Sequence, residues 1–166
     1  MSKLLEGIKV LDVAQVAAVP IAARILADRG AEVIHVENPK LGDQFRYLVQ
    51  FLNQKNGIRS EINYIWEQYN RNKKGITLDL SQEAGQAVLH RMVESADVLL
   101  TNLRPFELER FRVDYQTLSR INPRLVAGFL TGFGKEGPDK DLPAYDHVAY
   151  WARSGIPHRM RALSPV

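Results

Sequence analysis

The sequence predicts an α/β fold, in which one mainly parallel sheet carries helices on both faces. Short apolar runs rich in β-branched residues alternate along the chain with segments that show a helical stripe. The 166 residues correspond to about one domain. Because 45% of them are hydrophobic and 25% are charged, the chain has the composition of a globular protein with a real core.

The first third of the chain is predicted to be a strand, a helix and a strand. Residues 8–13 are short, apolar and β-branched, as in a buried strand. A helix is expected from Pro20, because proline is tolerated at the first helical position, to Gly30, which suits a left-handed cap. Val33–Val36 is the second strand, and the connection predicts that the two strands are parallel.

The middle of the chain has the weakest pattern. Short helices are expected at residues 46–52 and 62–69, with a break between them. A third strand is expected at residues 76–80. An amphipathic helix follows it, and Ser81 is expected to be the N-cap of this helix.

The last part of the chain is predicted to contain two more strands, at residues 98–101 and 125–130. Two short helices are expected between them, near residues 106–111 and 115–121. Another helix is expected to begin at Asp146, whereas the final residues show no clear period and are expected to form neither a strand nor a helix.

Composition excludes several classes of protein. The chain has no cysteine, which rules out disulfides and thiolate metal sites and fits a reducing cytoplasm; we expect no metal site. The net charge of +3 is too small to indicate nucleic-acid binding. No apolar run approaches the roughly 18 residues that span a bilayer, and the N-terminal run is too short for a signal peptide. We therefore expect a cytoplasmic protein that binds neither nucleic acid nor a membrane.

The predicted sheet also locates a ligand site. In an open parallel sheet, ligands bind beyond the carboxyl ends of the strands. Four segments reach this edge, namely residues 14–20, 38–43, 102–105 and 131–138. Gln15, in the first of them, offers a side-chain amide either to a substrate carboxylate or only to solvent.

A basic cluster, Arg71, Lys73 and Lys74, precedes the third strand. Such a cluster is either a solvated turn or a contact for a polyanion, since charge-assisted hydrogen bonds to phosphate are strong.

Four motifs, in this order, resemble those of the family III CoA-transferases. They are Gly7–Asp12 with Gly30–Glu37, Asn70–Leu80, Ala96–Pro105 and Gly132–Pro138. The family includes formyl-CoA, crotonobetainyl-CoA and phenyllactate CoA-transferases and the α-methylacyl-CoA racemases. The resemblance implies the N-terminal part of the family's Rossmann-like large domain. It implies an incomplete CoA-binding domain at residues 1–156 and, at residues 157–166, a tail that starts a linker to a second domain.

The resemblance further implies that coenzyme A or an acyl-CoA is a substrate and binds along the carboxyl edge of the sheet. It places the first loop near the thioester, the second loop near the adenine and the 3′-phosphate ribose, and the segment after the fourth strand along the pantetheine and the phosphates. The expected CoA contacts are Val16, Asn38, Lys40, Arg71, Lys73, Leu78, Asn102, Leu103 and Arg110.

The reaction that the resemblance implies is transfer of CoA from an acyl-CoA to a carboxylic acid. A nucleophilic aspartate forms a mixed anhydride and then an aspartyl-CoA thioester. Asp146 takes the place of an acidic residue of the family and is expected to be auxiliary. Tyr145 stands where the racemases have a histidine, so transfer is favoured over racemisation. The resemblance places the nucleophilic aspartate C-terminal to the position of Asp146. No aspartate follows Asp146 in this sequence, and this chain alone is therefore expected to lack the nucleophile and to be inactive.

Several interpretations stay open at this point. The chain is a truncated or split N-terminal part of a CoA-transferase, a stand-alone CoA-binding module without catalysis, or a racemase-like isomerase. Members of the family form interlinked dimers, and an incomplete domain exposes apolar surface. We therefore expect a homo-oligomer or a complementary C-terminal chain as a partner.

Overall fold

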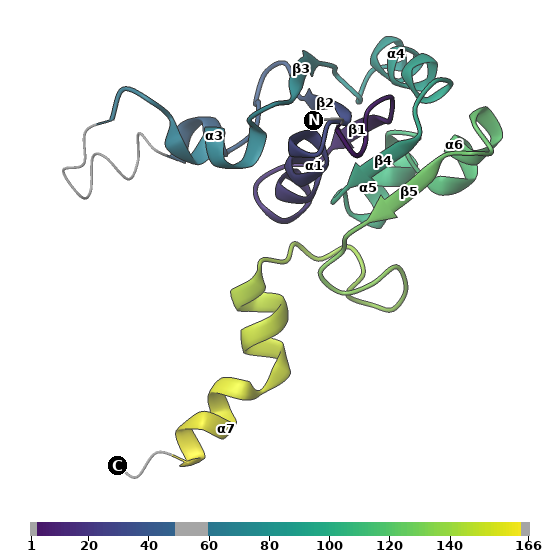
Figure 1. Cartoon of the computed structure of the whole chain (residues 1–166). Coiled ribbons are helices and arrows are strands. Elements are labelled where there is room, and N and C mark those ends of the chain that lie inside the picture. The colour runs from purple at the N-terminus through teal and green to yellow at the C-terminus, as the bar shows by residue number, and fades with distance from the viewer. Residues whose placement is uncertain (1–2, 49–59, 164–166) are drawn as a thin grey trace.

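A computed structural model of the chain describes residues 3–48 and 60–163. Its described part contains one sheet of five parallel strands, in the order β3-β2-β1-β4-β5 (Figure 1). The strands are β1 (Lys9–Val13), β2 (Glu32–Glu37), β3 (Lys74–Thr77), β4 (Val98–Thr101) and β5 (Val126–Phe129). This order is that of a doubly wound Rossmann-like sheet, so the predicted α/β class is confirmed.

Helices cover both faces of the sheet, as expected. On one face lies α1 (Ala18–Asp28), which also contacts α3 (Tyr64–Asn70). On the other face lie α4 (Glu83–Val93), α5 (Pro105–Arg110) and α6 (Tyr115–Ile121).

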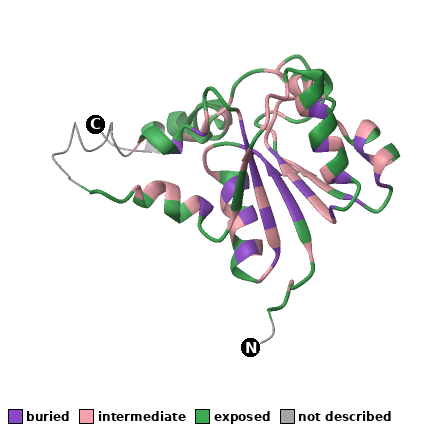
Figure 2. Cartoon of the chain, turned by 90° about the horizontal axis from the view of Figure 1, so that it is seen from above, coloured by how far each residue is buried: buried purple, intermediate pink, exposed green. Residues whose placement is uncertain are grey.

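Successive residues of each strand point to opposite faces, and they therefore enter two separate cores. Val10 and Val33 pack against Ala23 of helix α1. Leu11 and Leu99 belong to the larger core on the other face, which contains apolar residues of α4, α5 and α6. Figure 2 shows buried residues concentrated in the strands and on the helix faces turned toward them.

Helix α1 begins two residues earlier than expected, with Pro20 inside its first turn. Proline is tolerated there because the first N–H groups of a helix have no partner within it. The helix ends in a Schellman motif: the N–H of Gly30 donates to the carbonyl of Ala27, and that of Ala31 donates to Leu26. Gly30 has a φ of +104°, so the expected glycine cap is confirmed.

The third strand and the following helix differ from the expectations. Strand β3 ends at Thr77 rather than at residue 80, because Thr77 pairs with Glu37, the last residue of β2. The expected N-cap at Ser81 is wrong, since Gln82 takes that position. The Ser81 hydroxyl instead donates to the carboxylate of Asp79, 2.6 Å away, in the preceding turn. Of the helix expected at residues 46–52, residues 49–52 lie outside the described ranges.

The C-terminal segment forms two helices that extend away from the sheet (Figure 1). They are the π-helix η1 (His147–Ala152) and α7 (Ile156–Leu163). The final residues were expected to form neither a strand nor a helix. This expectation is wrong for residues 156–163, which form α7. Arginine, methionine, alanine and leucine are all good helix formers, and Ile156, Met160 and Leu163 recur at the spacing of one helix face.

Candidate functional site

A pocket of 660 Å³ lies at the carboxyl edge of the sheet, where β1, β4 and β5 end. Its walls come from the loops after these strands and from the segment before η1. The lining includes Gln15, Val16, Ala17 and Ala18 after β1, Asn102, Leu103 and Arg104 after β4, Leu130, Thr131 and Gly132 after β5, and Leu142, Ala144, Tyr145 and Asp146. The structure thus brings together five of the residues expected at a site: Gln15, Val16, Asn102, Leu103 and Asp146.

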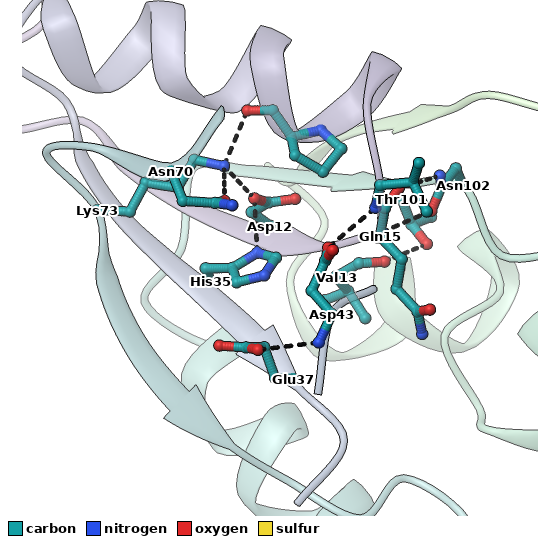
Figure 3. Close-up of polar contacts among 12 residues, drawn as sticks. Asp12, Val13, Gln15, His35, Glu37, Asp43, Asn70, Lys73, Thr101 and Asn102 are labelled. Carbon is teal, nitrogen blue, oxygen red and sulfur yellow. Dashed lines mark hydrogen bonds and ion pairs between the residues drawn. The ribbon is translucent and has the colours of Figure 1, made fainter. Parts of the chain in front are cut away.

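The loop after β1 is joined to the loop after β4 by the side chain of Asn102. Its Oδ1 accepts from the backbone N–H of Gln15 at 3.0 Å, and its Nδ2 donates to the Gln15 carbonyl at 2.8 Å (Figure 3). The neighbouring Thr101 hydroxyl donates to the carbonyl of Val13 at 2.7 Å. These bonds fix the backbone of Gln15 and leave its side chain exposed beside the pocket.

Val16 has a backbone conformation that its residue type disfavours. Its φ is +67°, in the left-handed region, which is a true outlier for a β-branched residue. The Val16 N–H donates to Oδ2 of Asp43 at 2.9 Å. Asp43 lies in the loop after β2 and is completely buried. Burial raises the pKa of the Asp43 carboxyl, and the N–H groups of Phe45 and Val16 offset this effect only in part.

Asp43 is held in turn by Glu37, whose Oε2 accepts from the Asp43 N–H at 3.1 Å. Arg46 binds both oxygens of Glu37, at 2.7 and 2.5 Å, and its guanidinium lies 3.7 Å from the centre of the Trp66 ring. Burial acts to raise the pKa of Glu37, but the bonds from Arg46 and from Asp43 outweigh it and hold that pKa below its ordinary value.

The pocket contains charged groups of both signs. Arg104 donates two side-chain hydrogen bonds to Glu107, each of 3.0 Å. Burial acts to raise the pKa of Glu107, but these bonds prevail and the pKa is lowered. Asp146 is exposed, with His147 3.6 Å away. The Tyr145 hydroxyl donates to the Gln44 side chain at 3.3 Å and so joins two walls of the pocket.

Four further expected residues lie outside the pocket lining. The side chain of Asn38 closes a turn by accepting from the N–H groups of Lys40 and Leu41. Hydrogen bonds from Ser81 lower the pKa of Asp79 in the loop after β3, and the charge of the exposed Lys40 adds a smaller lowering. The Leu78 side chain packs against the larger core. Arg110 is exposed at the end of α5.

Two members of the basic cluster lie at the amino edge of the sheet, opposite the pocket. Arg71 donates to Asp28 at 3.0 Å, and Lys74 donates to Glu32 at 2.5 Å. Asp28 ends α1 and Glu32 begins β2, so both acids belong to this edge. Residues that precede a parallel strand must lie at its amino end, and Arg71 therefore does not join the pocket residues.

Lys73, the third member, is buried in the core between the sheet and α1. Its Nζ donates to Oδ2 of Asp12 at 2.7 Å, to the carbonyl of Pro20 at 2.8 Å and to Oδ1 of Asn70 at 2.8 Å (Figure 3). Oδ2 of Asp12 also bonds Nδ1 of His35 at 2.8 Å. Burial lowers the pKa of Lys73, and Asp12 counteracts this effect. All three donors of the ammonium are used and its side chain is 1% exposed, so this cation is not available to an external phosphate.

Sequence reasoning missed Asp43, Glu37 and Thr101 as supports of the site. The signal for Asp43 is a Gly-Asp pair in a loop that follows a buried strand, at the end of the edge segment 38–43. Within residues 3–48 and 60–163 no group of three or more His, Asp or Glu is suited to a metal ion. No helix of these ranges is long and apolar enough to cross a membrane.

Comparison with known proteins identifies relatives that match nearly the full length of this chain. The profile of CoA-transferase family III matches residues 5–162. The cinnamoyl-CoA:phenyllactate CoA-transferase of Clostridium sporogenes is 42% identical over 155 residues, which are 93% of this chain and 37% of that protein. The (R)-2-hydroxy-4-methylpentanoate CoA-transferase of Clostridioides difficile is 36% identical over 92% of this chain and 38% of its own length.

Among solved structures, Rv3272 from M. tuberculosis has a TM-score of 0.79 and 33% sequence identity, over 99% of this chain and 42% of that one. The chain thus spans about two fifths of the length of its relatives. Since the family profile covers most of its residues, the chain belongs to CoA-transferase family III.

Proposed function

We propose that this chain forms the acyl-CoA-binding part of an enzyme that moves CoA between an acyl-CoA thioester and a carboxylic acid. Membership of the family supports CoA transfer in general. The single observation that carries the proposal is the pocket at the carboxyl edge, where the fixed loop at Gln15 and Val16 faces Asn102 and Leu103. A thioester entering this edge meets both loops at once.

The proposed reaction proceeds through two covalent intermediates. An aspartate oxygen attacks the thioester carbonyl, the C–S bond breaks, and a mixed anhydride and CoA thiolate result. The thiolate attacks the aspartyl carbonyl of the anhydride, which releases the donor acid and leaves an aspartyl-CoA thioester. The acceptor carboxylate then reverses these two steps and leaves as the new acyl-CoA. Because no aspartate follows Asp146, we propose that the nucleophile lies outside these 166 residues.

The pocket residues suggest separate roles in substrate binding. The exposed side-chain amide of Gln15 is placed to donate to the acceptor carboxylate, and Asp146 at the pocket wall is an auxiliary acidic group. Lys40 and Arg110 are exposed cations suited to the CoA phosphates.

We propose an apolar 2-hydroxy acid as the acceptor. The pocket wall has apolar side chains at Val16, Leu103, Leu130 and Leu142. The names of the two relatives described above contain phenyllactate and 2-hydroxy-4-methylpentanoate, acids with aryl and branched side chains.

Calorimetric titration of the chain with CoA tests this function. We expect binding that weakens as salt is added, because exposed phosphate contacts are screened. We expect Arg110→Ala to lower the affinity about tenfold, as the loss of a charge-assisted hydrogen bond would. Arg124→Ala is the control, since Arg124 is also exposed but precedes β5, at the opposite edge of the sheet.

The same sample, incubated with phenyllactate and cinnamoyl-CoA, is expected to show no CoA transfer by mass spectrometry. Turnover by the pure chain would contradict the proposed position of the nucleophile. Absence of CoA binding at millimolar concentration would contradict the function itself, and equal affinities of the wild type and Arg110→Ala would remove Arg110 from the site.

We further propose that a second copy or a complementary chain covers η1. Its side chains Val148, Tyr150 and Trp151 are large, apolar and exposed. The helix extends away from the sheet (Figure 1). We therefore expect the chain to form oligomers unless a partner is present. Light scattering at tens of micromolar checks this expectation, and a stable monomer would contradict it.

A further inference from the structure

The wall of the pocket contains a strained residue that a distant side chain holds in place. Val16 lines the pocket with a φ of +67°. For an L-residue, the left-handed conformation is sterically unfavourable, because Cβ approaches the carbonyl oxygen. An outlier of this kind persists only where its surroundings determine it. The partner of the Val16 N–H is Asp43, 27 residues further along the chain.

Both carboxylate oxygens of Asp43 accept from backbone N–H groups. Oδ2 accepts from Val16 at 2.9 Å, and Oδ1 accepts from Phe45 at 2.7 Å. Asparagine has the same shape but only one acceptor oxygen, so it can retain one of these bonds and must turn its NH₂ group toward the other N–H. The arrangement therefore requires an aspartate and not merely a polar side chain.

Asp43 itself has little freedom. Its side chain is completely buried, and its own N–H donates to Glu37. Arg46 holds Glu37 with two hydrogen bonds and packs on the ring of Trp66 in α3. Residues of β2, of the loop that follows it and of α3 therefore hold Asp43, the hydrogen-bond partner of Val16, in place.

We propose that Asp43 is a positioning residue for the acyl-CoA pocket, whose carboxylate holds Val16 in the left-handed conformation and so sets the pocket wall at residues 15–18. Asp43 does not line the pocket and acts through Val16. The inference rests on the proposed function only where ligand affinity is concerned, because the state of the loop is measurable without a ligand.

The test compares Asp43→Asn with Asp114→Asn. Asp114 is a matched control, since its carboxylate also accepts a backbone N–H, that of Thr117, and it does not line the pocket. In Asp43→Asn we expect the Val16 amide to exchange with deuterium at least tenfold faster than in the wild type, measured by NMR, and the CoA affinity to fall about tenfold. Asp114→Asn should change neither quantity by more than twofold.

Glycine at position 16 separates positioning from a general structural effect. Glycine adopts positive φ without the steric cost, so its left-handed conformation depends less on the hydrogen bond to Asp43. We expect the tenfold loss of CoA affinity caused by Asp43→Asn to shrink below threefold when both proteins also carry Val16→Gly. An equal loss in both backgrounds would overturn the proposal, as would an unchanged Val16 amide in Asp43→Asn. If the wild type does not bind CoA, the proposed function fails, and the exchange rates alone decide the role of Asp43.

Discussion

Lys73→Met is expected to lower the free energy of unfolding by about 3–5 kcal/mol, a large part of the stability of a domain of this size. The ammonium of Lys73 and the carboxylate of Asp12 are both buried, with side chains 1% and 0% exposed. Methionine fills a similar volume but leaves the carboxylate in the core with His35 as its remaining partner. It also removes the bonds that join Asn70 and Pro20 to this cluster. Urea unfolding monitored by circular dichroism measures the change.

Lys74→Met is the matched control for this prediction. The adjacent Lys74 also pairs with an acid, Glu32, but these side chains are 72% and 41% exposed, so little change is expected. The double variant with Asp12→Asn and Lys73→Met should recover part of the loss, because it no longer buries an unpaired charge. Equal stabilities of the two lysine variants, or no recovery in the double variant, would contradict the importance of the buried pair.

Asn102→Ala is expected to lower CoA affinity at least tenfold. The Asn102 side chain makes both hydrogen bonds that hold the backbone of Gln15, and each such bond is worth about 1 kcal/mol. Without them, the loop at residues 15–18 separates from the loop after β4, and binding must restore its order. Calorimetric titration with CoA gives the ratio of dissociation constants.

Asn122→Ala is the control for Asn102→Ala. Asn122 also uses its amide to join separate segments, donating to the carbonyls of Val93 and Ala96, but it precedes β5 at the edge opposite the pocket. We expect this variant to be less stable while keeping a CoA affinity within twofold of the wild type. A loss of affinity in both variants would show that stability, and not the loop, is responsible. An unchanged affinity in Asn102→Ala would remove the loop from the site.

The alternation of apolar runs and helical stripes determined the fold class, because it reflects which residues each element can bury. The strand at residues 98–101 and the helix at residues 115–121 were predicted with the bounds that the structure has. The position of the pocket also followed from the sequence, since the carboxyl ends of parallel strands meet at one edge. Gln15 and Asn102 were expected there from their places after the first and fourth strands.

Only the tertiary structure decided what the individual charges do. Arg71, Lys73 and Lys74 form one basic cluster in the sequence, but the structure exposes the first and third and buries the second against Asp12. Likewise, Asp43 was expected only as part of the edge segment 38–43, and the structure connects it to Val16. A local sequence pattern shows which residues of a helix or strand are buried. The partner of a buried charge, in contrast, is a residue distant in the chain. That partner is defined only when the strands have been placed side by side.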